Sequence, residues 1–116
     1  MISFFYFFML GFLLTHELDG VKCHEWRILP FVSRLPEQAA ERFFVWAHVP
    51  LIAALFYNGA GDPTSGMAKG ISIFSIIHVG LHWLFRKHRH NEFDNIGSWV
   101  LIIGAGILGA SHLVTV

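Results

Sequence analysis

The sequence predicts an all-α fold, a bundle of four transmembrane helices with both termini outside (N-out and C-out). Two observations lead to this prediction. Of the 116 residues, 54% are hydrophobic and only 14% are charged, whereas soluble domains carry about 25% charged residues. Four apolar stretches also divide the chain, and none contains Asp, Glu, Lys or Arg: 2–15, 43–57, 70–85 and 96–116. A chain of this length forms one domain, so a single integral membrane domain (1–116) holds all four spans.

The length of each apolar stretch decides where the spans end. A helix needs about 20 residues to cross a bilayer, and only the last stretch reaches that length unaided. The others reach it by extending into polar flanks, so we expect spans at about 2–19, 38–57, 70–86 and 96–116. Pro36 before Glu37 is typical of a first helical turn and favours a second helix that starts there.

The first stretch is interpreted as a retained span. No basic residue precedes it and no small-residue cleavage site follows it, as both would in a signal peptide. It runs directly into His16 and Glu17 instead.

The distribution of cations predicts the orientation of the bundle. Segments 16–42 and 86–95 lie on the same side of a four-span protein and together carry seven Lys and Arg residues. Segment 58–69, on the other side, carries only Lys69. The positive-inside rule therefore places the first two segments in the cytoplasm, and we expect a multi-pass protein of the inner (plasma) membrane.

Charge and cysteine content exclude several classes of protein. Eight basic residues balance eight acidic ones, so no positive excess is available to bind nucleic acid. Cys23 is the only cysteine, which excludes an intrachain disulfide and a cysteine-based zinc finger. The chain also lacks the Glu-x-x-His, His-Glu-x-x-His and Gly-x-Ser-x-Gly motifs of di-iron carboxylate proteins, zinc proteases and serine hydrolases.

Histidine is the residue type that points to chemistry. The chain has eight histidines, and the predicted orientation places seven in its cytoplasmic half: His16, His24, His48, His78, His82, His88 and His90. His112 lies near the outer end, where we expect a structural role. An ionisable residue inside a membrane is a functional hypothesis by default.

The spacing of these histidines predicts a metal site near the cytoplasmic face. His78 and His82 are four residues apart and share one helix face. Imidazole and carboxylate together form the ligand set of zinc and non-haem iron. The predicted metal ligands are His16, His48, His78 and His82. The predicted catalytic carboxylates are Glu17, Asp19 and Glu25. We expect Glu17 or Asp19 to be a metal ligand or a general base, and Glu25 to hydrogen-bond and orient one of the metal ligands.

Several short strings resemble those of a known family. They are Thr-His-Glu-x-Asp at 15–19, Glu-Trp at 25–26, His-x-Pro-Leu at 48–51, a histidine at 78 and His-x-Glu-Phe at 90–93. The sequence resembles the small four-helix bacterial membrane proteins that are grouped as a domain of unknown function. This resemblance covers nearly the whole chain and implies fold and membrane location but no activity. The positions that it marks are His16, Glu17, Asp19, Glu25, Trp26, His48, His78, Glu92 and Phe93.

Two further likenesses are looser. The chain lacks the string of the membrane proteins named for a His-x-x-Glu-Glu motif. His78 and His82 match one element of histidine-box hydroxylases and of ceramidase-like hydrolases, but the remaining elements are absent, so these likenesses are chemical analogies.

The leading functional hypothesis is metal-dependent hydrolysis or oxidation of a lipid-like substrate that reaches a zinc or iron site from the inner leaflet. One alternative is a non-catalytic accessory subunit of a larger membrane complex, in which the histidines bond neighbouring helices. Another is a haem- or chlorin-binding protein with His48 and His78 as axial ligands. The expected partners are the lipid bilayer and other membrane subunits or further copies of the chain.

Overall fold

The computed structural model describes residues 1–116 and is entirely helical, which confirms the predicted all-α class. It contains four α-helices and no strands. Two short 3₁₀ turns, η1 (Glu25–Arg27) and η2 (Val32–Arg34), lie between the first two helices. The four helices are α1 (Ile2–Lys22), α2 (Glu37–Tyr57), α3 (Gly66–Leu84) and α4 (Ile96–Thr115).

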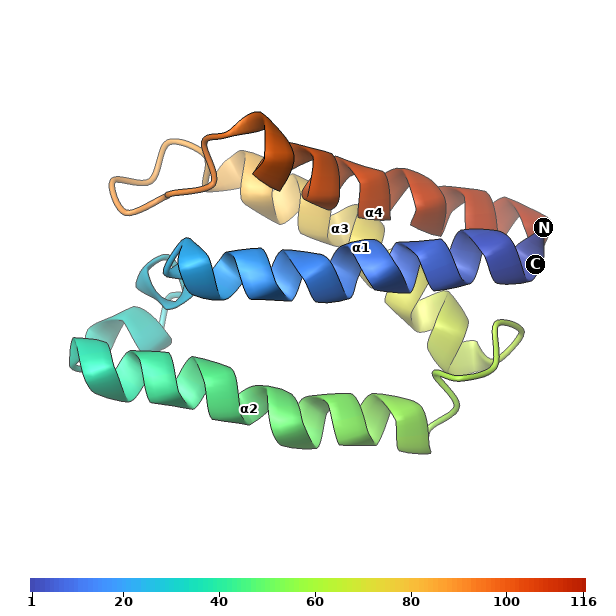
Figure 1. Cartoon of the computed structure of the whole chain (residues 1–116), viewed down its shortest axis with the longest axis horizontal. Helices are drawn as coiled ribbons and strands as arrows, with labels where there is room; N and C mark the ends of the chain where they lie inside the picture. The colour runs from blue at the N-terminus through green and yellow to red at the C-terminus, as the bar shows by residue number, and fades with distance from the viewer.

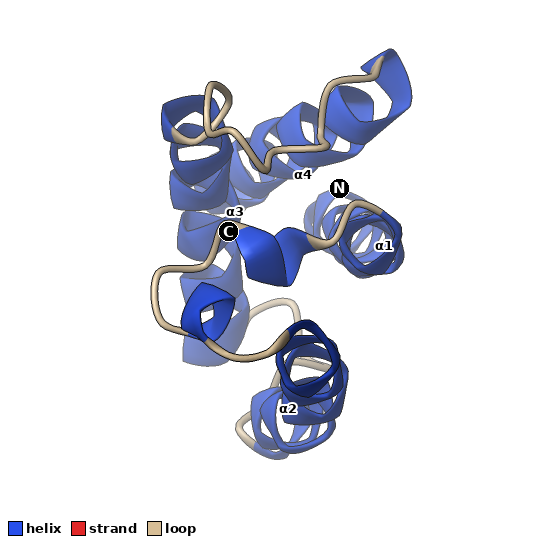
Figure 2. Ribbon diagram, turned by 90° about the vertical axis from the view of Figure 1, so that its left-hand side faces the viewer, coloured by secondary structure: helices blue, strands red, loops and turns tan.

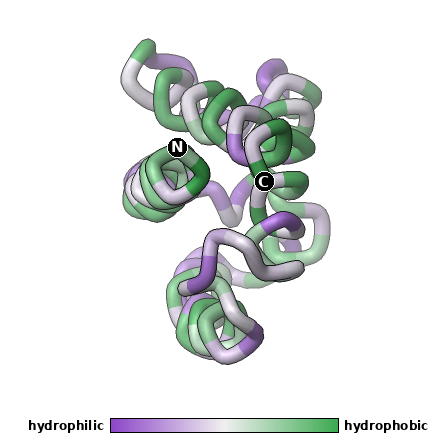
Figure 3. Tube along the Cα trace, turned by 90° about the vertical axis from the view of Figure 1, so that its right-hand side faces the viewer, coloured by the Kyte–Doolittle hydropathy of each residue, from purple (hydrophilic) through white to green (hydrophobic).

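Each helix is long and apolar enough to cross a membrane, judged by length and composition. Helices of 19 to 21 residues are about 30 Å long at a rise of 1.5 Å per residue, which matches the thickness of the hydrocarbon core. Figure 3 shows hydrophobic residues along all four helices. Large apolar side chains lie on the outside, for example Phe4 (53% exposed) and Leu84 (70% exposed). The exposure of so many apolar side chains to water would be unfavourable, and a bilayer would cover them.

Three of the helices form the packed unit, and α2 stands apart from it (Figures 1 and 2). Helices α1 and α4 run antiparallel side by side, and α3 crosses against α4. Small residues allow the close approach of α3 and α4: a Cβ on Gly106 would clash with Val79, and one on Gly109 would clash with Ser75. Such contacts are typical of helix packing in membranes.

The half of the bundle near the two termini has a core whose polar groups are all paired internally. Tyr6, Met9 and Ala105 are completely buried there, and the Tyr6 hydroxyl donates a hydrogen bond to the Ala60 carbonyl (2.7 Å). His112 Nε2 donates to the Pro63 carbonyl (2.7 Å). In the tautomer that carries its proton on Nε2, His112 Nδ1 accepts from the Ser72 hydroxyl (2.7 Å).

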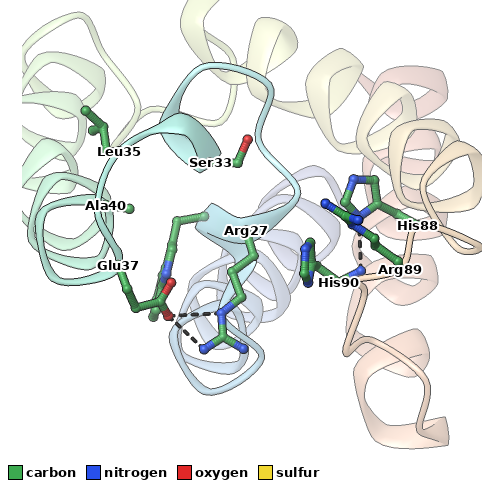
Figure 4. Close-up of a pocket in the computed structure, with 9 residues that line it drawn as sticks. Arg27, Ser33, Leu35, Glu37, Ala40, His88, Arg89 and His90 are labelled. Atoms are coloured by element: carbon green, nitrogen blue, oxygen red, sulfur yellow. Dashed lines mark hydrogen bonds and ion pairs between the residues drawn. The ribbon is translucent and has the colours of Figure 1, made fainter.

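At the opposite end, the segment after α1 folds back over the helix ends. His24 adopts a left-handed conformation (φ 52°), which reverses the chain direction after α1, and η1 follows directly. Trp26 is then buried against Ala40 and Phe44 of α2. Figure 4 shows the Arg27 guanidinium paired with Glu37, across from the loop that carries His88, Arg89 and His90.

Candidate metal centre

Four buried side chains converge at this end of the bundle. They are His16 from α1, Glu25 from η1, and His78 and His82 from α3. One ligand atom from each residue lies within 4.8 Å of one ligand atom from each of the others. His16 is completely buried, and no member is more than 8% exposed. The fold thus gathers four metal-ligating groups from three separate segments.

The two α3 histidines and His16 reach the group for simple helical reasons. His78 and His82 are one turn apart, on the same buried face of α3 as Ile71 and Ser75. His16 extends the buried face of α1 that includes Leu13. Because α1 and α3 are both packed in the same unit, these faces meet inside it.

Glu25 depends on two features of the backbone. The left-handed His24 turns the chain back toward α1. Gly20 then leaves space for the Glu25 carboxylate against the helix, because a Cβ at position 20 would clash with Glu25 Oε2. A glycine within a helix costs roughly 0.5–1 kcal/mol relative to alanine, and here, in the last turn of α1, it admits a buried carboxylate.

The separations of the ligand atoms fit a small tetrahedral ion. His78 Nε2 and His82 Nε2 share a hydrogen bond at 3.1 Å, and Glu25 Oε1 lies 3.5 Å from His82 Nε2 and 3.9 Å from His16 Nε2. Zinc-to-ligand distances of about 2.0–2.2 Å in a tetrahedron separate neighbouring ligand atoms by about 3.4 Å. These three separations bracket this value, and the remaining pairs of ligand atoms lie within 4.8 Å.

The group holds more polar atoms than the protein satisfies. Neither nitrogen of His16 has a hydrogen-bond partner, and the same is true of His78 Nδ1 and Glu25 Oε2. A buried polar group without a partner costs about 1–3 kcal/mol, and native proteins contain few of them. Several such atoms in one place indicate a binding site for an ion or ligand that the chain itself does not supply.

The charge of the group also suits a cation. Burial alone would raise the pKa of Glu25, but contacts with His16 and His82 outweigh it and lower the pKa from 4.5 to about 2. Glu25 is therefore a carboxylate. A carboxylate beside three imidazoles is a set of donors that suits a divalent cation.

Aromatic side chains enclose the group. The Phe93 ring lies 4.7 Å from the His82 ring and 5.4 Å from the His16 ring, centroid to centroid. Phe74 stacks on His78 at 5.2 Å. Phe93 is only 1% exposed, so it shields the group from the loop side. Enclosure of this kind lowers the local dielectric and strengthens the attraction of the site for an ion.

A comparison with protein families places the chain. The model of a family of unknown function (DUF6713) matches residues 2–116. The chain belongs to this family. No curated protein and no solved structure matches the chain. Membership in DUF6713 agrees with the resemblance to a family of unknown function that the sequence suggested, and it assigns no activity.

In this member of DUF6713, three of the four predicted ligands come together, and the fourth lies elsewhere. His16, His78 and His82 share the group, whereas His48 pairs with Glu17 (Nε2 to Oε2, 2.7 Å). His48 Nδ1 also donates to the Phe44 carbonyl (2.6 Å). Both nitrogens of His48 are therefore engaged, and neither has a lone pair free for a metal in this arrangement.

The three predicted carboxylates also separate. Glu25 lies among the ligand atoms, Glu17 lies with His48, and Asp19 Oδ1 accepts a weak hydrogen bond from the Cys23 thiol (3.8 Å). Burial and the neighbouring Asp19 raise the pKa of this thiol, which keeps it protonated. The catalytic roles of Glu17, Asp19 and Glu25 stay predictions.

Sequence reasoning missed two contributors to the group. Gly20 was overlooked, although a glycine at the end of the polar string 15–20 is itself a signal of close approach. Phe74 was not considered at all, although it stacks on His78. Their roles depend on what faces them across the bundle, which spacing along one helix does not reveal.

The arrangement favours a bare ion over a porphyrin-type cofactor. Axial histidines of haem lie on opposite faces of a wide macrocycle, whereas the rings of His16 and His78 are 4.7 Å apart and those of His78 and His82 are 4.5 Å apart. No macrocycle fits between rings this close. The pair His48 and His78 offers no alternative, because both nitrogens of His48 are engaged.

Proposed function

We propose that this protein is an integral membrane metalloprotein that binds one divalent transition-metal ion through His16, Glu25, His78 and His82. The observation that carries the proposal is the convergence of four buried ligand atoms within 4.8 Å, with neither nitrogen of His16 hydrogen-bonded. A histidine that only held helices together would find hydrogen-bond partners within the protein, as His112 does.

Zinc is the first candidate for the ion, and iron is the second. Four nitrogen and oxygen ligands in a tetrahedron suit zinc, whereas iron is typical of sites that combine histidine and carboxylate and keep open positions. Either ion would supply a Lewis acid for a carbonyl or phosphoryl oxygen of a substrate. With Glu25 as the fourth ligand, a tetrahedral site would be closed. In that chemistry Glu25 would therefore act as the base that takes up a proton beside the ion, and the three histidines would hold the ion with one position open.

The finer proposal is an enzyme that hydrolyses or oxidises a lipid-like substrate at the cytoplasmic face. Its support is the position of the group at the end of the bundle near segments 23–36 and 85–95. These segments, with Lys22 and Arg42 beside them, carry seven of the eight Lys and Arg residues. By the positive-inside rule, this distribution favours a cytoplasmic location for this end of the bundle. Both termini would then lie outside, and the bundle would lie in the plasma (inner) membrane. A substrate that reaches a site at this depth comes from the inner leaflet.

Elemental analysis of the protein, purified in detergent without an affinity tag or a chelator, tests the metal proposal. We expect about one equivalent of zinc or iron per chain, and its loss in His78→Ala. His88→Ala is the matched control, because it makes the same change at an exposed histidine and should leave the metal content unchanged. If iron is found, an absorption spectrum without a Soret band assigns it to a non-haem site.

A chain that binds no metal, although its melting curve shows that it is folded, contradicts the proposal. The non-catalytic accessory subunit then becomes the better explanation, and copurifying membrane subunits would support it. Metal that persists in a folded His78→Ala variant also contradicts the assignment of the site.

A further inference from the structure

A groove separates α2 from the packed unit. Its volume is about 430 Å³, which lies within the range of about 300–1,000 Å³ that small-molecule sites occupy. Apolar side chains from α1, α2 and α3 line it. The principal apolar contacts come from Leu10, Leu14, Leu51, Leu55, Met67 and Phe74.

The only polar side chains that line this groove are Glu17 and His48. They connect α1 to α2 by a bond of 2.7 Å and are about a quarter to a third exposed. His48 has no further capacity, because its Nδ1 donates to Phe44. Glu17 Oε2 is engaged, but Glu17 Oε1 accepts no hydrogen bond from the chain. The groove therefore offers one free acceptor in otherwise apolar surroundings.

We propose that this groove binds a single-chain amphiphile whose head group donates a hydrogen bond to Glu17, such as a monoacylglycerol or a long-chain alcohol. The apolar walls would cover one hydrocarbon chain, and the gain in free energy scales with the apolar area removed from water or from looser contacts. An acceptor at the polar end of an apolar groove favours a head group with a hydroxyl over one that cannot donate, because only the hydroxyl replaces the hydrogen bond that the acceptor loses when the chain of the ligand displaces water.

The groove shares a wall with the metal group. Glu17 directly follows His16 in α1, and Phe74, which lines the groove, stacks on His78 with ring centroids 5.2 Å apart. A head group at Glu17 would therefore lie beside the candidate metal ligands. This part of the inference rests on the proposed function and deepens it, since it names the chemical class of substrate.

Two glycines of α3 allow a matched test. Gly70 lines the groove, and a Cβ at this position meets nothing within 4 Å, so we expect Gly70→Phe to fill the groove with a new side chain. Gly80 is also on α3, is exposed and likewise has open space around it, but it does not line the groove. Gly80→Phe is therefore the control for adding the same side chain to the same helix.

The probe is a monooleoylglycerol with a photoactivatable diazirine in its chain, added to the full chain in phosphatidylcholine nanodiscs. We expect saturable labelling of peptides from the groove walls, at least tenfold reduced in Gly70→Phe and unchanged in Gly80→Phe. Unlabelled monooleoylglycerol should compete about tenfold better than its dimethyl ether, which cannot donate.

Labelling spread evenly over the lipid-facing helices, or labelling unaffected by Gly70→Phe, overturns the groove as the binding site. Equal competition by the dimethyl ether overturns the assignment of Glu17 as the acceptor. Metal content, measured on the same samples, separates this proposal from the previous one. Saturable labelling of a metal-free wild type refutes only the metal site, and a metal-loaded wild type without saturable labelling refutes only the groove.

Discussion

His16 and His112 are both completely buried, but only His112 has hydrogen-bond partners for its ring nitrogens. At the end near the termini, His112 donates to Pro63 and accepts from Ser72, both at 2.7 Å. At the other end, His16 has no hydrogen-bond partner on either nitrogen. It lies instead 3.9 Å from Glu25 and beside the rings of two further histidines.

This difference separates a structural histidine from a candidate ligand. Burial alone does not distinguish them, because histidine commonly bonds neighbouring helices in membrane bundles. What distinguishes them is whether nearby backbone and hydroxyl groups satisfy the imidazole. Around His112 these groups are provided by α3 and the preceding loop. Around His16 the neighbours are other ligand-type side chains, which an ion would satisfy together.

The largest expected effect comes from removing the metal. A ligand that binds only the folded state stabilises it by about 4 kcal/mol when its concentration is 1,000 times the Kd. A strong chelator should therefore lower the melting temperature of the wild type markedly. It should have no effect on His16→Ala, which has lost the site, while His112→Ala should keep the response. If the chelator leaves the melting temperature of the wild type unchanged at every concentration, His16 is not a metal ligand and does not differ from His112 in this respect.

Gly20→Ala should weaken the site through Glu25. The added methyl group displaces the Glu25 carboxylate, and losing a supporting group typically costs 10- to 100-fold in metal affinity. Gly11→Ala is the control, since it lies on the same helix with nothing within 4 Å of the new Cβ. The measurement is competition with a metal-binding dye. Equal affinities in the two variants would show that Glu25 does not hold the ion.

His112→Ala should reduce stability without changing metal content. The substitution leaves the Ser72 hydroxyl and the Pro63 carbonyl without their partner, at a cost of about 1–3 kcal/mol. Unfolding in detergent measures the stability, and elemental analysis of the folded fraction measures the metal. Loss of metal from folded His112→Ala would mean that the two ends are not independent.

The smallest effect is expected at His48. Because Glu17 and Phe44 engage both of its nitrogens, His48→Ala should change the metal affinity by less than about twofold. This result would separate the structure from the prediction made on spacing, which counted His48 among the ligands. A loss of metal comparable with that in His78→Ala would restore His48 to the site.

Much of the site was predictable from local sequence, and the remainder was not. The i,i+4 spacing of His78 and His82 already placed both on one face, and His16 belonged to the same predicted end. Glu25 and His48 were the difficult residues. The position of Glu25 depends on the left-handed His24 and on Gly20. The pairing of His48 with Glu17 depends on the distance between α2 and α1.

The sequence by itself determined the class of protein. Long runs without charge predict helices of the length of a bilayer, and the structure has four helices that are long and apolar enough to cross one. Tertiary structure alone decided which histidines are satisfied and which converge. Periodicity specifies the face of a helix on which a side chain lies, but not the segment that packs there. For His112 that segment is the loop at Pro63, and for His16 it is the returning η1 turn with Glu25.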